Sequence, residues 1–380
     1  MNGVSRHAAN LATALLQTNA VSELHFVAGS WQKEMFRRTC ERADSRFHAH
    51  FVTLGDSNFS RLHWYYRELP HIATQLGVDV VHFACCVPLR AGAFRCSTVV
   101  SLHDLYSFDI PENFGRFKST VTRRIMAQCI RHVDGIACVS ESTRSRLEAW
   151  FPRELHKAET ICNIVEPDRC SHADAFHLVP PGRDFLLCVA QHRRNKNIGI
   201  ALGIFGRLIQ RRVVPSATQL VVVGIAGPET ASIREQIRSL KLESNVLLTS
   251  GLSDAQLQWC YRHCKLLLAP SITEGFGLPI AEALLAGCPV VCSDIPAFRE
   301  IGGELCHYVD GGEGSIGGYT DAIREVLVLP RPGAIVMPHL SSRFIAQKYV
   351  DFYGRLPCRG ISVSGMLRPT QQGQIVRGCE

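Results

Sequence analysis

The chain has 380 residues, a formal net charge of +7 and a hydrophobic fraction of 46%. This length suggests two domains or one large one, and the hydrophobic fraction is typical of a globular protein with a sizeable core. No stretch has the length and apolarity of a membrane span, the chain does not open on a secretion signal, and no dense basic and aromatic stripe points to nucleic acid. The 16 cysteines therefore indicate reduced, mostly buried thiols in the cytoplasm.

The first half of the chain alternates strands with helices. A polar opening that contains Gly3 precedes an amphipathic helix, and Pro70 is expected to break or kink a later helix. Ser140 or Ser142 is expected to cap the helix that ends at Trp150. The expected helices cover residues 8–17, 31–42, 62–76, 117–132 and the stretch up to 150, and the expected strands cover 24–28, 50–54, 78–83, 98–102, 135–139 and 160–165.

The second half repeats this alternation after a stretch without clear periodicity at residues 171–183. The expected strands cover 185–190, 219–223, 246–249, 265–270, 289–292 and 307–310, and the expected helices cover 198–211, 232–242, 254–263, 279–286, 319–328 and 342–353. The alternation predicts two α/β domains with parallel sheets, over residues 1–178 and 179–355, followed by a mobile tail over 356–380. Ligands of such sheets bind at the carboxyl ends of the strands, where His103, residues 191–197 and residues 274–278 fall, so we expect the site between the domains.

Residues 271–282, SITEGFGLPIAE, carry the strongest local signal. An apolar run leads into a glycine turn, and Pro279 stands where a helix begins, because its fixed φ suits the first helical turn. Free N–H groups at such a helix start favour an anion, while Glu274 and Glu282 suit sugar hydroxyls. The combination suggests a nucleotide-sugar site. The alternative is an ordinary glycine turn with a glutamate that complements the helix dipole.

The chain closely resembles the retaining glycosyltransferases of family 4, especially mannosyltransferases, in residues 250–254 (SGLSD), 270–283 (PSITEGFGLPIAEA), 287–291 (GCPVV) and 299–302 (REIG). The signature of that family is the spacing of Glu274 and Glu282, with seven residues between them. The resemblance covers about residues 2–355 and is most specific in the second half. It implies the GT-B fold, in which two Rossmann-like domains with parallel sheets face each other across a cleft.

The resemblance also implies roles for single residues. Glu274 would hold the donor sugar near the reacting centre and Glu282 would bind the ribose, while Lys196 would neutralise the leaving diphosphate. His103 would be the active-site histidine of the acceptor domain. The remaining donor-binding residues implied by the resemblance are Gly3, Arg194, Gly251, Leu252, Phe276, Gly277 and Leu278.

Two features depart from the family pattern. Gln191 stands where many relatives have an arginine, so Arg193 or Arg194 is expected to substitute. Relatives also begin with a strand before the glycine loop, whereas Gly3 follows almost directly on Met1. We therefore expect either a start annotated too late or a sheet that lacks its first strand.

The implied function is transfer of a hexosyl unit, mannose among the candidates, from a GDP- or UDP-linked sugar to a glycan or lipid-linked acceptor in cell-surface polysaccharide synthesis. No metal and no other cofactor is expected, because no Asp-x-Asp pair stands at a strand end. The expected location is the cytoplasm, with room for peripheral membrane contact through the basic helix at 117–132. Two alternatives stay open: an inactive nucleotide-sugar-binding protein of the same fold, and an epimerase or phosphorylase.

Other motifs give weaker signals. Gly312, Gly314 and Gly317 fit a dinucleotide fingerprint but occur late in the chain, where a glycine-rich connection is the preferred interpretation. Cys260, His263 and Cys264 lack a second pair at zinc spacing, so metal binding is not expected there.

Overall fold

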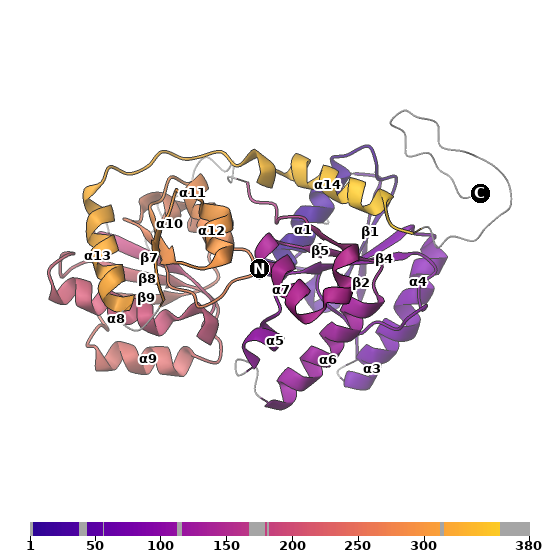
Figure 1. The fold of residues 1–380 in the computed structure, drawn as a ribbon, viewed down its shortest axis with the longest axis horizontal. Coiled ribbons are helices and arrows are strands. Elements are labelled where there is room, and N and C mark those ends of the chain that lie inside the picture. Colours follow the sequence, from indigo (N-terminus) through magenta and orange to yellow (C-terminus); the bar gives the residue numbers. More distant parts are fainter. Residues whose placement is uncertain are drawn as a thin grey trace. The chain divides into compact units, whose positions relative to one another are not determined.

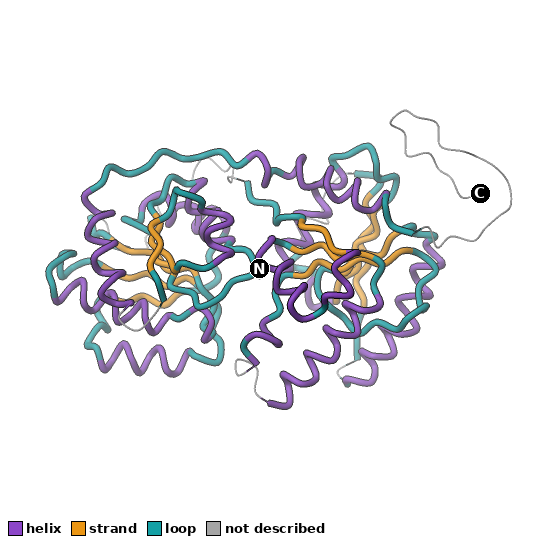
Figure 2. Tube along the Cα trace, viewed as in Figure 1, coloured by secondary structure: helices purple, strands orange, loops and turns teal. Residues whose placement is uncertain are grey.

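The computed structural model describes residues 3–37, 44–55, 57–111, 116–166, 179–180, 182–311 and 315–357. These form two compact units, unit 1 with Met1–Ile164 and His339–Glu380 and unit 2 with Val165–Pro338 (Figure 1). In each unit the strands lie inside a shell of helices (Figure 2). No helix among the described residues combines the length and the apolarity that a membrane crossing requires.

Unit 2 contains a six-stranded sheet in the order β12-β11-β10-β7-β8-β9, with every neighbouring pair parallel. Its strands are β7 (Phe185–Val189), β8 (Gln219–Val223), β9 (Val246–Thr249), β10 (Leu267–Ala269), β11 (Val290–Ser293) and β12 (His307–Val309). Its helices are α8 (Ile198–Gln210), α9 (Thr230–Ser239), α10 (Asp254–His263), α11 (Leu278–Leu285), α12 (Pro296–Gly302) and α13 (Ser315–Val328), with the short turn η5 (Arg194–Lys196) before α8. Alternate strand residues such as Leu186, Cys188 and Leu220 pack against α8, α9 and α13, and α10 to α12 lie on the other side of the sheet (Figure 1). Burial on both faces explains why these strands are nearly continuous apolar runs.

Unit 1 contains two parallel sheets, one with β1 and β2 and one in the order β3-β4-β5-β6. The strands are β1 (Leu24–Gly29), β2 (Phe47–Val52), β3 (Val80–Phe83), β4 (Ser97–Leu102), β5 (Gly135–Cys138) and β6 (Ala158–Thr160). The helices are α1 (Gly3–Leu16), α3 (Asn58–His63), α4 (Leu69–Leu76), α5 (Tyr106–Asp109), α6 (Arg116–His132), α7 (Glu141–Trp150) and α14 (Ser342–Gly354), with short turns η1 (Ser30–Gln32), η2 (Trp64–Glu68), η4 (Pro152–Lys157) and η6 (Pro338–Leu340). The strands and helices of both halves confirm the predicted α/β class with parallel sheets.

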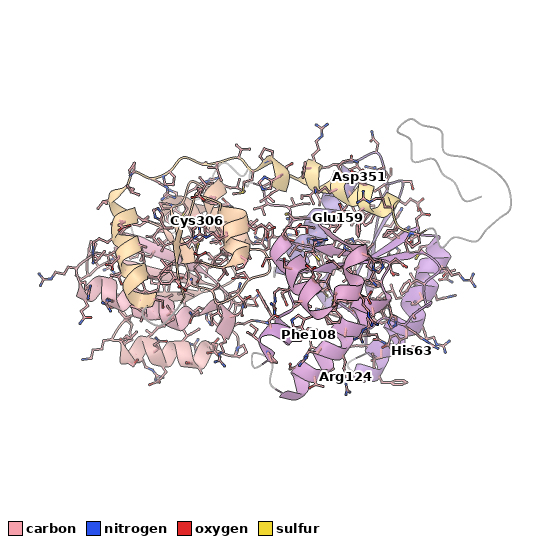
Figure 3. All side chains as sticks on the ribbon, viewed as in Figure 1. His63, Phe108, Arg124, Glu159, Cys306 and Asp351 are labelled. Carbon is pink, nitrogen blue, oxygen red and sulfur yellow. The ribbon has the colours of Figure 1, made fainter. Side chains whose placement is uncertain are left out.

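The helix α14 belongs to unit 1, although the sequence analysis placed residues up to 355 in the second domain. Ile345 and Tyr349 of α14 share an apolar cluster with Leu11 of α1 and Val99 of β4. An ion pair between Arg355 and Glu159, which is labelled in Figure 3, also ties the end of α14 to β6. The apolar face of α14 is therefore covered by the first half of the chain. The predicted boundary at 178 and most of the predicted tail lie outside the described residues.

Pro70 does not break its helix. The chain is helical from α3 through η2 to α4, with a wider π turn in η2 directly before the proline. Proline has no N–H to give to the carbonyl four residues earlier, and its ring crowds that carbonyl. In the π turn Leu69 N–H instead bonds to Trp64 O, five residues back, which lets the helix pass the proline.

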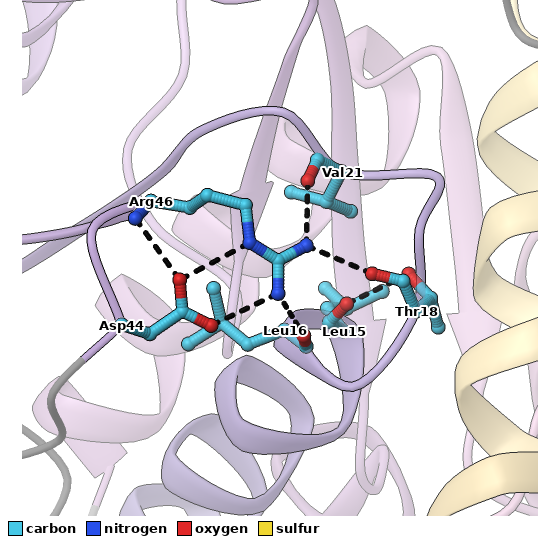
Figure 4. Close-up of polar contacts among 6 residues, drawn as sticks. All are labelled: Leu15, Leu16, Thr18, Val21, Asp44 and Arg46. Carbon is cyan, nitrogen blue, oxygen red and sulfur yellow. Dashed lines mark hydrogen bonds and ion pairs between the residues drawn. The ribbon is translucent and has the colours of Figure 1, made fainter.

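The helix α1 begins at Gly3, so the residues predicted as a polar loop are its first turn. Its carboxyl end is held by Arg46 at the start of β2, which donates to Leu16 O, to Thr18 O at 2.9 Å and to Val21 O at 3.0 Å (Figure 4). Asp44 accepts from the same guanidinium at 2.9 Å. Arg46 thus satisfies carbonyls that the end of a helix leaves without partners.

Other predictions had mixed outcomes. Ser140 caps α7 by accepting from Thr143 N–H, which confirms one of the two predicted caps. The helix predicted over 31–42 is only the short turn η1 and the turns that follow it, and residues 38–43 lie outside the described part of the chain. Gly312 and Gly314 of the predicted glycine-rich connection also lie outside the described residues. The helices α5 and α12 have no counterpart in the sequence prediction.

Candidate functional site

The predicted strand, glycine turn and helix are present in unit 2 as β10, the loop 270–277 and α11. Gly277 caps α11 with a φ of +101°, a conformation that other residues rarely adopt. A Cβ at this position would also lie 3.1 Å from Phe298 of α12. Gly277 therefore allows the chain to turn sharply and enter the helix beside a buried ring. The following N–H groups start a helix with Pro279 in its first turn, as predicted.

Glu274 is held by two side chains. Lys196 Nζ lies 2.6 Å from Glu274 Oε1 and 2.7 Å from Oε2, and Ser271 Oγ donates to Oε1 at 2.8 Å. The lysine side chain is 18% exposed and the glutamate side chain 9%, so water screens this ion pair only partly. Lys196 and Glu274, which the sequence analysis placed on opposite parts of one ligand, are thus in direct contact.

The loop that carries Lys196 is fixed to the loop that carries Glu274. Ile272 N–H donates to Asn195 O at 2.8 Å, and buried Asn195 donates through Nδ2 to Thr273 O at 3.4 Å. Asn197 then takes a left-handed conformation with a φ of +53° and starts α8. These two hydrogen bonds, one between backbone groups and one from the Asn195 side chain, hold the loop of Lys196 beside the loop of Glu274.

Glu282 lies near the middle of α11 with only 8% of its surface exposed. Tyr261 of α10, itself fully buried, donates its hydroxyl to Glu282 Oε2 at 2.8 Å. Arg331 donates to the carbonyls of Tyr261 and Cys264, both at 2.6 Å, and so fixes the end of α10. The second carboxylate of the motif is therefore oriented from a neighbouring helix. The sequence analysis did not assign this role to Tyr261, because no spacing rule links α10 to α11.

The other predicted residues of unit 2 lie near the carboxyl ends of the strands. Arg194 lies in η5, is exposed, and makes no side-chain hydrogen bond or ion pair with the described residues, and the same holds for Arg193. Phe276 is buried at 4% exposure beside Gly277. Gly251, with a φ of +75°, and Leu252 follow the end of β9.

Two glycines that the sequence analysis left without a role permit close packing at the same edge of the sheet. A Cβ on Gly224 would lie 1.8 Å from Ala190 O, and a Cβ on Gly227 would lie 2.5 Å from His192 O. The side chain of His192 is fixed by Thr230 Oγ1, 2.9 Å from its Nδ1. The loops after β7 and β8 therefore touch through backbone, where any side chain would push them apart.

Of the predicted residues of unit 1, Gly3 is the first residue of α1 and His103 directly follows β4. His103 Nε2 lies 2.9 Å from Ala84 O, so this nitrogen carries the proton. Burial lowers the pKa of His103 below its ordinary value, although the bond to Ala84 opposes the shift. The ring of His7 on α1 stands edge-on to His103 with the centroids 4.9 Å apart.

His7 begins a chain of buried hydrogen bonds that the sequence analysis missed. Its Nδ1 lies 2.9 Å from Asn163 Oδ1 and its Nε2 lies 2.8 Å from Ser101 Oγ, which also lies 2.8 Å from His82 Nε2. The remaining nitrogen of His82 meets the hydroxyl of Tyr353 on α14. An amide oxygen only accepts, so Nδ1 of His7 donates and its Nε2 accepts from Ser101. Ser101 then accepts from His82 Nε2, and Tyr353 donates to His82 Nδ1.

This arrangement keeps both histidines neutral. Burial and the neighbouring histidines His103 and His82 lower the pKa of His7 well below its ordinary value. Burial, with a further contribution from His103, lowers the pKa of His82 to about 3. A proton added to either ring would place a second donor where the network needs an acceptor.

The basic helix α6 has partners inside unit 1. Arg123 lies over the rings of Phe108, at 4.9 Å, and Trp150, at 5.9 Å, and Arg131 lies over Phe151 at 5.8 Å. Figure 3 marks Phe108 beside α6. These arginines therefore contribute to packing within the unit.

The cysteine motif on α10 also has a structural explanation. Cys260 and Cys264 are buried, and Cys264 Sγ lies 3.3 Å from Cys288 Sγ. Burial raises the pKa of Cys264 well above its ordinary value. Within the described residues no three His, Cys, Asp or Glu side chains are grouped as metal ligands would be.

The two halves of the chain match two protein-family models. The model described as Glycosyltransferase Family 4 matches residues 1–169, and the model described as Glycosyl transferases group 1 matches residues 172–327. The first match covers most of unit 1, and the second covers most of unit 2.

Curated relatives have similar sequences at low identity. The O-antigen chain mannosyltransferase RfbU of Salmonella typhimurium is 23% identical over 61% of this chain and 61% of its own length. The serotype-specific mannosyltransferase WbdA of Escherichia coli is 27% identical over 58% of this chain and 28% of its own length. The chain thus spans less than two thirds of these relatives.

A solved structure shows the fold. Anabaena HepE, in a complex with UDP and glucose, superposes with a TM-score of 0.66 at 17% identity, over 93% of this chain and 96% of its own. The fold is therefore GT-B, as predicted. Because one family model matches each half and the models together cover most of the sequence, the chain belongs to the family 4 glycosyltransferases.

Proposed function

We propose that the chain transfers a hexosyl unit, with mannose the favoured sugar, from a nucleoside-diphosphate sugar to a glycan or lipid-linked acceptor in cell-surface polysaccharide synthesis. The transfer retains the configuration at the anomeric carbon. The observation that carries the proposal is the arrangement of charged side chains around α11. Lys196 pairs with Glu274 in the loop before this helix, and Glu282 lies within the helix. The hydroxyls of Ser271 and Tyr261 hold the two carboxylates.

The contacts of this group suggest how a donor binds. Lys196 Nζ and Glu274 Oε1 lie 2.6 Å apart, so the two charges neutralise each other. An ammonium group also binds a diphosphate well, and a carboxylate accepts hydrogen bonds from sugar hydroxyls. A nucleotide sugar offers both groups in one molecule, so its binding would exchange the ion pair for two contacts with ligand. The N–H groups of Phe276, Gly277 and Leu278 would meet the sugar and the diphosphate, and Glu282 would accept from the ribose.

The reaction needs charge compensation on the leaving diphosphate. Lys196 and the start of α11 supply it, with Arg194 exposed beside them. We propose that this basic set acts without a metal or another cofactor. We further propose that the leaving phosphate oxygen takes the proton of the acceptor hydroxyl, so that no protein nucleophile forms a covalent intermediate. His103 is proposed to act on the acceptor side, and Gly3 is proposed to contribute to donor binding.

The relatives guide the choice of sugar. RfbU and WbdA are named as mannosyltransferases and WclY of Escherichia coli as an O-antigen biosynthesis glycosyltransferase, which favours mannose and a surface polysaccharide. HepE is described with UDP and glucose. We therefore propose a GDP-linked donor first and a UDP-linked donor second. Reaction in the cytoplasm, at the inner face of a membrane, would suit a lipid-linked acceptor.

Calorimetric titration with GDP and with UDP tests the donor site. One nucleotide is expected to bind, and Glu282→Ala is expected to weaken that binding at least about tenfold, because it removes a charged acceptor for the ribose hydroxyls. Glu235→Ala, on the exposed face of α9 in the same unit, is the matched control. Equal affinities of wild type and Glu282→Ala would contradict the assignment of Glu282.

Transfer from the matching nucleotide sugar to a glycan acceptor tests the activity. Glu274→Ala is expected to lose transfer by a factor on the order of a hundred or more, since the carboxylate lies at the reacting centre in the proposal. Full transfer by Glu274→Ala would refute that role. Nucleotide binding without any transfer by the wild type would favour the inactive binding protein instead.

A further inference from the structure

A recess in unit 1 has no part in the proposed donor site. It has a volume of about 600 Å³ and lies between the helical segment of η2 and α4 and the loop before β4. This volume falls within the range of small-molecule sites. Its lining residues are Tyr66, Arg67, Pro70, His71, Thr74, Arg90, Ala91, Gly92, Ala93 and Arg95.

The recess is basic. Arg67, Arg90 and Arg95 line it together with His71, and none of its lining residues is acidic. All three arginines are exposed, and within the described residues none of their side chains makes a hydrogen bond or an ion pair. Glu68, the acidic residue next to Arg67, lies 3.7 Å from His63 instead. Three arginines therefore line one hollow, and no lining residue carries a carboxylate to compensate their charge.

The wall that carries two of these arginines is a tight turn. Ala93 N–H donates to Arg90 O at 3.2 Å, and Gly92 has a φ of +67° with open space where a Cβ would stand. The opposite wall is the helix, whose Pro70 is buried and whose Tyr66 is fixed through its hydroxyl by Gln128 of α6 at 3.0 Å. The recess is thus built on elements whose backbone is held in place, and the arginines extend from them.

We propose that this recess binds a phosphate group, carried either by a soluble molecule or by a lipid headgroup. Arginine presents a planar fork of donors that matches the oxygens of phosphate, and several guanidinium groups together suit its double charge. The arginines are the donors of the recess, because the Tyr66 hydroxyl donates to Gln128 Oε1 and the Thr74 hydroxyl donates to Pro70 O. The inference does not depend on the donor site, because it uses unit 1 residues that the proposed reaction leaves without a role.

The experiment compares two double variants of the full chain that lose the same charge. Arg90→Gln/Arg95→Gln removes two guanidinium groups from the recess. The control, Arg238→Gln/Arg324→Gln, removes two exposed arginines of unit 2 that pair with Glu235 and Asp321. Each protein is titrated with inorganic pyrophosphate and is sedimented with phosphatidylcholine vesicles that contain or lack phosphatidylglycerol. Because Lys196 is intact in both variants, the difference between them reports the recess alone.

We expect the recess variant to bind at least one probe about tenfold more weakly per arginine lost, and the control variant to bind like wild type. A difference with pyrophosphate alone assigns a soluble phosphate, and a difference with phosphatidylglycerol vesicles assigns a lipid headgroup. The proposal is overturned if wild type binds neither probe, or if the two double variants bind both probes equally. Thermal melts of both variants check that the exposed substitutions leave the fold intact.

Discussion

Each carboxylate of the Glu-x7-Glu motif accepts a hydrogen bond from a hydroxyl of a residue outside α11. Ser271 holds Glu274, and Tyr261 holds Glu282, at 2.8 Å in both cases. A carboxylate fixed before its ligand arrives loses less conformational entropy on binding than a mobile one. We therefore infer that both hydroxyls act as positioning groups for the donor.

Removal of the tyrosine hydroxyl should weaken nucleotide binding without unfolding unit 2. Tyr261→Phe deletes one buried hydrogen bond to Glu282, which contributes roughly 0.5–1.5 kcal/mol, equivalent to about a twofold to thirteenfold loss of affinity. Calorimetric titration with the nucleotide that binds wild type measures this change.

The matched control is Tyr319→Phe, which removes another buried hydroxyl of unit 2, one that lies 2.8 Å from Ser293 Oγ. It should change stability by a similar amount and leave nucleotide affinity unchanged. If both substitutions weaken nucleotide binding equally, Tyr261 has only a structural role.

At the residue scale the sequence predicted the local structure of the candidate site better than its contacts. The glycine turn, the helix start and both glutamates follow from local chemistry, and the structure places them as expected. The contact between Lys196 and Glu274 joins residues 78 positions apart, and that between Tyr261 and Glu282 joins neighbouring helices. Such pairs depend on how elements pack, which spacing along one chain does not encode.

Among the elements, α1 depends on a residue that lies directly before β2. Arg46 bonds to Leu16 O, Thr18 O and Val21 O beyond the end of the helix, and its side chain is 29% exposed. Arg46→Met should lower the stability of unit 1 by about 2 kcal/mol, because several carbonyls lose a charged donor. Urea unfolding followed by the signal of unit 1 measures the loss.

The control for Arg46 is Arg238→Met. The side chains of Arg238 and its partner Glu235 are 65% and 70% exposed, and ion pairs this exposed contribute little to stability. Arg46→Lys is informative as well, since one ammonium cannot reach all three carbonyls and should restore only part of the loss. A stability equal to wild type in Arg46→Met would show that the helix end needs no such cap.

Three neighbouring histidines, His7 of α1, His82 of β3 and His103 directly after β4, predict a pH dependence of unit 1. The folded-state pKa of His82 is about 3, below the ordinary value of about 6.5 that an unfolded chain shows. Below that ordinary value the unfolded state therefore binds more protons than the folded state. Stability is full above about pH 6.5 and falls as the pH drops toward the folded pKa, by roughly 2 kcal/mol or more. Urea unfolding across that pH range measures the fall.

The groups that face His82 include His7, His103, Ser101, Tyr349 and Tyr353, and none of these carries a negative charge to compensate a protonated ring. His82→Gln should therefore flatten the pH dependence at some cost in stability at neutral pH. His156→Gln, on an exposed histidine of the same unit, should leave the slope unchanged. Equal slopes in all three proteins would mean that other groups cause the acid sensitivity.

At the element scale the apolar runs predicted most strands to within one or two residues. The misses have physical causes. Pro70, which was expected to break or kink its helix, does not break it, because a π turn with Leu69 N–H bonded to Trp64 O precedes the proline and the helix continues. The helix α12 is only seven residues long and ends at a glycine, so its apolar face is too short to give a clear period.

On the scale of the whole molecule, the chain builds unit 1 from both of its ends. The apolar period of residues 342–353 predicts the helix α14. The sequence analysis assigned this helix to the second domain, together with the elements that precede it in the chain. Its Tyr349 and Phe352 instead pack with Leu15 of α1 and Ala137 of β5. A helical period shows that one face is covered but does not identify the surface that covers it.

A chain shortened to end at Leu340 should therefore lose the order of unit 1 and keep that of unit 2. The deletion removes Ile345, Tyr349 and other buried side chains of α14, and it leaves the apolar faces of α1 and β4 exposed to water. Hydrogen exchange should show lost protection in α1 and β4 and native protection in β7 and β8, whose core contains no residue of α14. The nucleotide should still bind if Lys196, Glu274 and Glu282 hold it. Lost protection in β7 and β8 to the same degree would mean that the two units fold only together, and that the division of the core into separate clusters does not govern stability.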